Sequence, residues 1–272
     1  MKIAIVSTVH NRKNKTEKAI QSLAFAVRDF EYRFYLCDDG STDGTREMLY
    51  KLPYPITVLE GDGNLFWSRG MYCAMKKATE DGADMYLLVN DDVEFYPDAI
   101  KIMLSSYKSA NMHCGIVGST ISLKNGSITY GGRRLNDSQL IKPNGSLQLC
   151  DLANWNCFLI DDYIVKNIGL IDNYYEHALG DYDYSLRMKA FGVPIYIAEK
   201  YVGSCENNEK KGTYHDKNTS RKERFKSMFS RSNMPYKSRW HYYMGNFGVK
   251  GLKGFLWPYI KCSICILARK DY

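Results

Sequence analysis

The sequence predicts an α/β protein whose central β-sheet is parallel in its first half and mixed in its second. Three observations support this fold class. Four short apolar runs in residues 1–110 alternate with segments of helical spacing. These runs are apolar throughout, which is typical of parallel strands covered by helices on both faces. Beyond Cys114 the alternation weakens, and turns rich in Gly, Asn and Ser suit a mixed or antiparallel half.

The first half contains four pairs of a strand and a helix. We predict strands over 2–9, 32–37, 56–59 and 85–89, and helices over 15–30, 42–52, 67–80 and 97–110. Ser41 or Thr42 is expected to cap the second helix. Three strands end in polar residues, at 10–12, 38–40 and 90–92. Since ligands bind parallel sheets at the carboxyl ends of the strands, these residues mark the candidate site.

The second half is predicted to hold strands over 115–123, 155–160 and 194–197, with a helix over 181–191. A length of 272 residues suits one large domain, or a domain of about 200 residues with an appendage. We expect a main domain over 1–205, with halves 1–112 and 113–205, and a C-terminal extension over 206–272.

The expected extension is strongly basic. Ten basic and three acidic residues lie between Glu209 and Arg239, an excess equal to the net charge of the chain, +7. This indicates an anionic partner: a diphosphate or an acidic lipid surface, with nucleic acid least favoured. Between Gly248 and Arg269 apolar and aromatic residues are interleaved with lysines, which fits a helix on a membrane surface or a helix docked on the main domain. Both alternatives stay open.

The eight cysteines show no framework spacing, so we expect them to be reduced. Cys262 and Cys265 form a single pair, whereas structural zinc needs four ligands, and we expect them to pack in a helix. Residues 1–9 lack the features of a signal peptide, and no stretch reaches the roughly 18 apolar residues of a membrane span. We expect a cytoplasmic protein, with peripheral binding to the inner membrane face as a further expectation.

Adjacent carboxylates at a strand end indicate a cation. Asp91 and Asp92 follow the fourth strand, and like charges at close range raise each other's pKa unless a cation neutralises them. Oxygen ligands without a His or Cys cluster favour Mg²⁺ or Mn²⁺. The alternative is that Asp92 only caps the turn before Val93. Asp38 and Asp39 follow the second strand, where they are expected either to bind a nucleoside or only to form a turn.

Three motifs, at 7–12, 38–45 and 90–92, resemble those of the family 2 glycosyltransferases, which have a GT-A fold, and the resemblance covers roughly residues 1–200. It implies a nucleotide-sugar-binding half over 1–112 and an acceptor-binding half over 113–205. It also implies that Asp39 reads the base, that Asp91 contacts the donor sugar or ribose, and that Asp92 ligates the metal. The other donor-side residues of these motifs are Thr8, His10, Arg12, Asp38 and Asn90.

Two further segments carry the resemblance. Residues 63–70 are similar to the donor-proximal loop of bacterial polysaccharide transferases, including rhamnosyltransferase-like ones. This implies that Asn64 and Trp67 lie near the donor and that Arg69 meets phosphate, although Arg69 is equally typical of an exposed helix residue. Residues 180–187 match the acidic pattern that carries the catalytic base. Asp181 takes the base position, and Asp183, on the acceptor side, is expected to orient Arg187 or the helix start.

The acceptor side and a third metal ligand rest on weaker matches. Trp155 and Asn156 stand where the family lines its acceptor site, and Trp155 is either a platform for sugar stacking or a buried core residue. His215 is a candidate metal ligand, because related enzymes often supply a late His. It lies in a basic loop without a firm motif, so a surface position is the default expectation.

The resemblance implies an inverting, metal-dependent glycosyltransferase that uses a UDP- or dTDP-sugar. The acceptor is expected to be a glycan or a polyprenyl-diphosphate-linked molecule in cell-surface polysaccharide assembly. A sugar nucleotidylyltransferase would need a glycine-rich phosphate loop near the first strand, and the chain has none. A non-catalytic sugar-binding protein would not need Asp92 and Asp181 together. Dinucleotide and P-loop signatures are also absent from the sequence.

Overall fold

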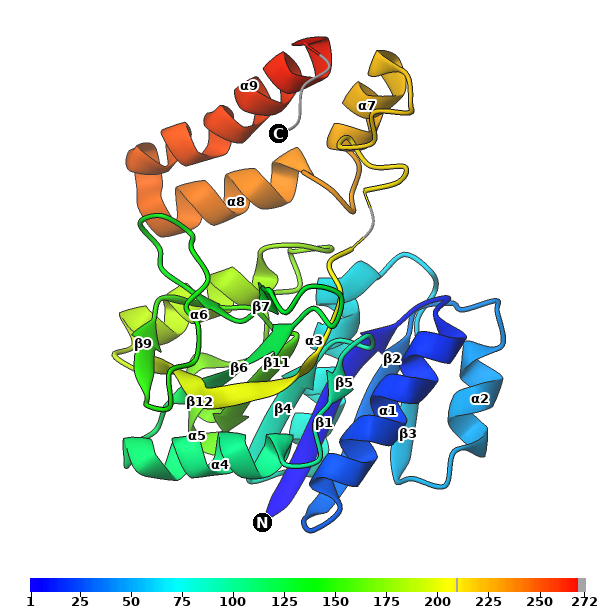
Figure 1. Cartoon of the computed structure of the whole chain (residues 1–272), viewed down its shortest axis with the longest axis vertical. Coiled ribbons are helices and arrows are strands. Elements are labelled where there is room, and N and C mark those ends of the chain that lie inside the picture. The colour runs from blue at the N-terminus through cyan, green and yellow to red at the C-terminus, as the bar shows by residue number, and fades with distance from the viewer. Residues whose placement is uncertain (209, 269–272) are drawn as a thin grey trace.

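A computed structural model describes residues 1–208 and 210–268 of the chain (Figure 1). Glu209 and Arg269, which bound the two predicted C-terminal segments, lie outside the described residues. The first half contains β1 (Lys2–Val9), α1 (Lys13–Val27), β2 (Glu31–Asp38), α2 (Thr45–Lys51), β3 (Ile56–Glu60), α3 (Phe66–Asp81), β4 (Met85–Val89), β5 (Glu94–Phe95) and α4 (Ala99–Ala110). The second half contains β6 (Gly115–Ile121), β7 (Ile128–Tyr130), β8 (Gly132–Arg133), β9 (Gln148–Cys150), β10 (Leu152–Ala153), β11 (Cys157–Asp161), α5 (Asp162–Ile168), α6 (Gly180–Ala190) and β12 (Ile195–Ser204).

The central sheet confirms the predicted α/β class with a mixed sheet. Its strand order is β3-β2-β1-β4-β11-β6-β12-β5. Strands β1–β4 run parallel, and β11 enters antiparallel between β4 and β6. Because β1, β2 and β4 run in the same direction, the polar residues that follow them meet at one edge of the sheet.

Helices cover both faces of the sheet (Figure 1). Side chains alternate along β1, so Ile3 and Ile5 join a core with α1, α2 and α4. Ala4 and Val6 face the opposite layer, formed with α3, α5 and α6. This two-sided burial explains why the strands of the first half are apolar throughout rather than alternating.

Several local expectations need correction. Neither Ser41 nor Thr42 caps α2, which begins at Thr45 after Gly44, and the Asp43 carboxylate accepts the Thr45 N–H. Helix α4 begins two residues after Pro97. Helix α5 and the short strands β5 and β7–β10 were not predicted, because segments this short carry too few residues to show a periodic pattern.

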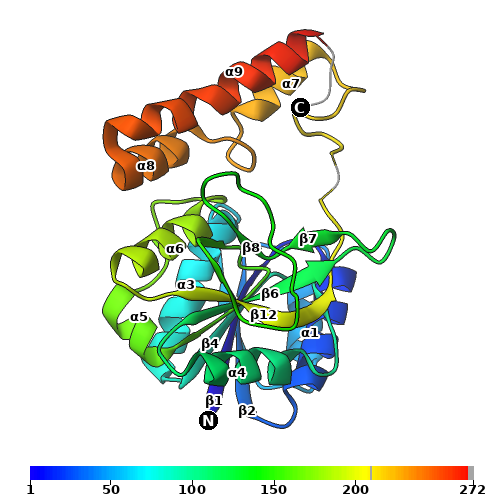
Figure 2. The same ribbon diagram turned by 60° about the vertical axis from the view of Figure 1, so that its left-hand side comes forward.

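Three further helices follow the sheet: α7 (Arg221–Met228), α8 (Tyr236–Phe247) and α9 (Leu252–Ala268), with a short 3-10 turn at Gly248–Gly251. They lie beyond the carboxyl ends of the parallel strands (Figures 1 and 2). We call α7–α9 the helical unit. Within the residues that the structure describes, no helix is long and apolar enough to cross a membrane. All eight cysteines are free thiols.

Candidate active site

A cavity of about 560 Å³ lies at the edge where the parallel strands end. Its walls come from the segments that follow β1, β2 and β4, from the start of α3, and from the segments that precede β11 and α6. The lining residues are Thr8, Val9, His10, Arg12, Asp39, Gly63, Phe66, Trp67, Asn90, Asp91, Asp92, Tyr130, Asn154, Trp155, Asn156, His177, Ala178, Leu179, Asp181, Tyr182 and Asn208. The fold therefore brings most of the sequence-predicted residues into one space.

The acidic pair after β4 faces a cation. Arg12 Nη1 lies 3.4 Å from Asp91 Oδ1 and 3.1 Å from Asp92 Oδ2. The two carboxylates are nearly buried, with side chains that are 9% and 12% exposed. The Arg12 guanidinium thus supplies positive charge beside the two carboxylates, for which the sequence predicted a metal ion. The carboxylate oxygens of Asp91 and Asp92 are also suitable ligands for a hard divalent ion.

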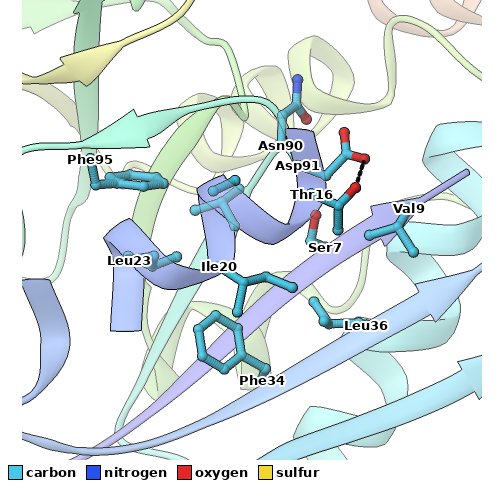
Figure 3. Close-up of a pocket in the computed structure, with 12 residues that line it drawn as sticks. Ser7, Val9, Thr16, Ile20, Leu23, Phe34, Leu36, Asn90, Asp91 and Phe95 are labelled. Atoms are coloured by element: carbon cyan, nitrogen blue, oxygen red, sulfur yellow. Dashed lines mark hydrogen bonds between the residues drawn. The ribbon is translucent and has the colours of Figure 1, made fainter. Parts of the chain in front are cut away.

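Asp91 lies over an apolar layer (Figure 3). Thr16 Oγ1 donates a hydrogen bond of 2.9 Å to Asp91 Oδ2. Burial raises the pKa of Asp91 to about 6, against the opposing effect of Arg12. Below the carboxylate is a void of only about 10 Å³ between Ile20 and Phe95, which has room for a single water at most. The larger cavity is therefore the candidate ligand site.

The side chains of Asp38 and Asp39 have different positions and different hydrogen-bond partners. Asp39 lies on the cavity, and its carboxylate accepts the backbone N–H groups of Gly63, Leu65 and Phe66 at 2.8–3.2 Å. It therefore holds the loop of residues 63–66 in place. Asp38 is fully buried away from the cavity and binds Arg46 Nε at 2.7 Å. Contact of Asp38 with a nucleotide stays a prediction, because this buried side chain does not line the cavity.

The residues after β1 and β4 position one another. His10 Nδ1 donates a hydrogen bond of 2.6 Å to the Asp39 carbonyl, and Thr8 Oγ1 donates one of 3.0 Å to the Trp67 carbonyl. Trp67 Nε1 donates to Asn90 Oδ1 at 2.8 Å. These bonds tie three strand ends and the start of α3 into one framework around the cavity.

Asn64 and Arg69 do not line the cavity. Arg69 Nη1 lies 3.3 Å from Glu176 Oε1, and its Nε donates to the Asn173 carbonyl at 3.1 Å. The Asn64 carbonyl accepts a bond of 3.4 Å from Arg231. Contact of either residue with a donor stays a prediction, because both side chains lie outside this cavity.

Arg231, which precedes α8, was not identified from the sequence. It donates two hydrogen bonds to Glu176, at 2.9 and 2.7 Å, and its guanidinium lies 4.4 Å from the centre of the Phe66 ring.

Phe66 has a φ of 58°, a left-handed conformation that is strained for an aromatic residue. Leu179, also on the cavity, has a φ of 76°. Strained non-glycine residues that share a cavity are typical of functional sites.

Asp181, at the start of α6, has the environment of a base. Its carboxylate accepts the Tyr182 N–H at 2.9 Å and the Asn154 side-chain amide at 3.2 Å, and only 8% of the residue is exposed. Burial raises the pKa of Asp181 to about 6, while the hydrogen bonds from Tyr182, Trp155 and Asn154 oppose the rise. A carboxyl group poised near neutrality suits proton transfer.

Asp183, two residues beyond Asp181 on α6, does not line the cavity. Its Oδ2 accepts from Arg187 Nε at 3.0 Å, and its Oδ1 accepts from Tyr175 and from Asn246 of α8. Contact of Asp183 with an acceptor stays a prediction, because neither Asp183 nor any of these partners lines the cavity. The alternative, that Asp183 orients Arg187, agrees with the geometry.

Trp155 is fully buried between Trp67, Phe158 and Tyr184. An indole without exposed surface has no face to stack on a sugar, so the burial alternative holds.

His215 does not line the cavity. Among the residues that the structure describes, no group of three or more His, Cys, Asp or Glu side chains is arranged to hold a metal. The role of His215 as a ligand stays a prediction.

Four buried polar atoms on the cavity have no hydrogen-bond partner within the described part of the chain. They are Asn154 Oδ1, Trp155 Nε1, Asn156 Oδ1 and His177 Nδ1. Burial, with a smaller contribution from the positive charge of Arg12, lowers the pKa of His177, so its ring is neutral. Buried polar groups are nearly always paired, so this concentration marks a polar part of the cavity that water or a polar ligand fills. Sequence reasoning missed Asn154 and His177, which belong to loops without a recognisable motif.

Comparison with known families decides the assignment. The model of glycosyl transferase family 2 matches residues 4–163. The chain belongs to this family. The prediction made from the three motifs is therefore confirmed, and the mixed α/β sheet agrees with the GT-A fold that this family implies.

Solved structures of low identity share the fold. TarS 1-349 from S. aureus in complex with UDP-GlcNAc has a TM-score of 0.58 and 14% identity, over 77% of this chain and 59% of that one. The mannosyltransferase PcManGT from Pyrobaculum calidifontis, in complex with GDP-Man and Mn²⁺, has a TM-score of 0.56 and 14% identity, over 98% and 78% of the two chains. This family 2 chain spans about 60% of the TarS fragment. No curated protein matches it.

Proposed function

We propose that this protein transfers a sugar from a nucleoside diphosphate donor to a hydroxyl group, with inversion at the anomeric carbon. The observation that carries the proposal is that one cavity of about 560 Å³ is lined both by Asp181 and by the pair Asp91 and Asp92. A transferase of this kind needs a base for the acceptor and positive charge for the leaving diphosphate.

In the proposed reaction, the ionised Asp181 carboxylate accepts the proton of an acceptor hydroxyl. The hydroxyl oxygen forms a bond to the anomeric carbon as the bond between that carbon and the diphosphate breaks, and the bonding electrons leave with the diphosphate. Attack from the face opposite the leaving group inverts the configuration. Hydrogen bonds from Tyr182 and Asn154 hold the carboxylate in position.

The leaving diphosphate would lie toward Arg12 and Asp92. A bound Mn²⁺ or Mg²⁺, held by Asp92 with Asp91 beside it, would supply positive charge to the departing oxygen. The Mn²⁺ in the PcManGT complex supports this choice of ion. Asp39 holds the loop of residues 63–66, so its part in base recognition acts through the backbone of that loop as well as through its own oxygens.

A hydroxyl-rich acceptor fits the opposite wall of the cavity. Among the residues that the structure describes, Asn156 Oδ1 and Asn154 Oδ1 have no donor, and neutral His177 offers one ring nitrogen without a partner. Sugar hydroxyl groups both donate and accept, so they can satisfy these atoms together. We propose a glycan, free or polyprenyl-diphosphate-linked, as the acceptor in cell-surface polysaccharide assembly.

Donor turnover tests the proposal. Release of nucleoside diphosphate should be measured with UDP-, dTDP- and GDP-sugars in the presence of Mn²⁺, with wild type, Asp181→Asn and Asp92→Asn. We expect each substitution to reduce turnover by at least about 100-fold. The matched control is Glu94→Gln, an exposed carboxylate two residues beyond Asp92. Turnover by both variants at the wild-type rate would refute the mechanism.

Binding gives a second measurement that does not depend on turnover. With a donor that binds wild type, Mn²⁺ should raise the melting temperature further, because ligands that bind only the native state stabilise it. Asp92→Asn should lose the Mn²⁺-dependent part of this shift, whereas Asp181→Asn should keep it. A shift retained in full by Asp92→Asn would remove Asp92 from the metal site.

A further inference from the structure

Helix α9 exposes an apolar face. Leu252, Leu256, Ile260 and Ile264 recur at intervals of four residues and are 37%, 48%, 48% and 58% exposed. This spacing places them on one side of the helix. We call these four residues the outer stripe. An apolar stripe normally faces a protein core, whereas this one faces solvent.

The opposite side of α9 is already packed. Cys262 and Ile266 are buried in a small cluster with Met228 and Met234. The Tyr259 hydroxyl donates a hydrogen bond of 3.0 Å to the Met234 carbonyl. The inner face of α9 therefore holds the helical unit together, and the outer stripe is not needed for that packing.

The charges around the outer stripe have one sign. Residues 236–268 contain five basic residues and no acidic residue. Lys250 and Lys253 are exposed near the start of α9. Trp257, which is 55% exposed, lies beside the stripe and is the kind of amphipathic side chain that settles at a lipid headgroup boundary. An apolar stripe flanked by lysines and Trp is complementary to an anionic bilayer surface.

We propose that α9 docks the protein on an anionic lipid surface, with the outer stripe inserted at the headgroup boundary and Lys250 and Lys253 against the acidic headgroups. This proposal does not depend on glycosyl transfer. It distinguishes between the two alternatives for the C-terminal helix: the inner face of α9 packs on the protein, and its outer face meets the lipid.

Docking would also orient the active site. The segment of residues 172–183, which runs from a loop into the first turn of α6 and carries Asp181, is fastened to α8 and to the segment between α7 and α8 by contacts that include three polar pairs. These are Arg231 to Glu176 at 2.7 Å, His241 Nε2 to Asp172 Oδ2 at 2.9 Å and Asn246 Nδ2 to Asp183 Oδ1 at 2.9 Å. The helical unit lies over the end of the sheet that carries the cavity (Figures 1 and 2). A docked helix α9 would therefore hold this loop at a set distance from the lipid.

Flotation with vesicles tests the proposal. The full chain is mixed with vesicles of phosphatidylcholine alone, or of equal parts phosphatidylcholine and phosphatidylglycerol, at low salt. The stripe variant is Leu256→Gln with Ile260→Gln and Ile264→Gln. The control variant is Leu123→Gln with Leu149→Gln, two leucines of the sheet domain that are 69% and 63% exposed. Both variants replace exposed aliphatic side chains by Gln, three in the stripe variant and two in the control variant.

Wild type and the control variant should float with the anionic vesicles, and the stripe variant should bind at least about tenfold more weakly. Lys250→Gln with Lys253→Gln should weaken binding to the anionic vesicles without affecting the melting temperature. Unchanged melting of the stripe variant would show that it folds.

Three outcomes would overturn the proposal. They are failure of wild type to bind anionic vesicles, equal binding by the stripe variant, and a wild-type dimer in sedimentation that the stripe variant abolishes. The last would assign the outer stripe to a second copy of the chain. Donor turnover without an acceptor is measured in parallel, so loss of lipid binding with normal turnover separates this proposal from the proposed function.

Discussion

Replacing Asp181 by Asn should make the protein more stable and much less active. The carboxyl group is 8% exposed, and its pKa is raised from 3.8 to about 6 by burial. Asn is nearly isosteric with Asp. Its oxygen can accept the Tyr182 N–H, and its amide can donate to Asn154 Oδ1, which has no partner among the described residues, once the Asn154 amide turns over. The substitution therefore removes a buried charge and keeps partners for the bonds to Tyr182 and Asn154.

The sign and the size of the expected change in stability follow from the linkage between protonation and folding. An acid whose pKa is higher in the folded than in the unfolded state contributes full stability below its unfolded pKa, here 3.8, and that contribution is lost as the pH rises through about 6. At a pH above both pKa values, the difference between them corresponds to a loss of about 3 kcal/mol in the free energy of unfolding. We therefore expect Asp181→Asn to exceed wild type by up to about 3 kcal/mol near pH 8 and by little near pH 4.

Urea unfolding of both proteins near pH 8 and near pH 4 measures the effect. The control is Asp183→Asn, on the same helix. Its carboxylate is paired with Arg187, Tyr175 and Asn246, so this substitution should destabilise by about 2 kcal/mol near pH 8. Activity gives a parallel test, because kcat/KM of wild type should rise with pH through about 6 as Asp181 ionises. An Asp181→Asn protein less stable than wild type near pH 8 would refute the reasoning.

Three further substitutions test the framework of the site. Asp38→Asn should destabilise the protein by about 2 kcal/mol in urea, because it removes the buried carboxylate from Arg46 and leaves that guanidinium only the exposed Glu60, while donor binding by the folded variant stays unchanged. A weaker donor affinity would restore Asp38 to the nucleotide site. Gly70→Ala should cost about 1 to 3 kcal/mol, because a Cβ there would lie 2.5 Å from the Thr8 side chain. Gly245→Ala, in an exposed turn of α8 with open space around it, should instead raise the melting temperature through a gain of about 0.5 to 1 kcal/mol. A loss at Gly245 as large as at Gly70 would contradict the steric argument.

The strand ends show how far the sequence could predict the site. Apolar runs followed by Asp39 and by Asp91 and Asp92 were enough to locate the edge of the sheet at which these carboxylates meet. The motif did not tell Asp38 from Asp39. Since side chains alternate along β2, one of two adjacent carboxylates must turn away from the cavity, and the pairing with Arg46 determines which one does.

The loops show where sequence reasoning ended. His177 and Asn154 lie in segments without periodicity, and their free polar atoms acquire meaning only through their position beside Asp181. Arg231 is more than 160 positions from Phe66, the ring on which it lies. Local patterns cannot report such contacts, because loop conformation is set by partners distant in the sequence.

The sequence by itself determined the four strand–helix pairs of the first half, the family, and the edge of the sheet at which the acidic residues gather. These features follow from hydrophobic periodicity and from the direction of parallel strands, which are local properties. Only the tertiary structure decided which carboxylates face the cavity, that Trp155 is buried, and that the apolar stripe of α9 points outward. Each of these depends on which surface of an element its neighbours cover, and that is settled only when the whole chain packs.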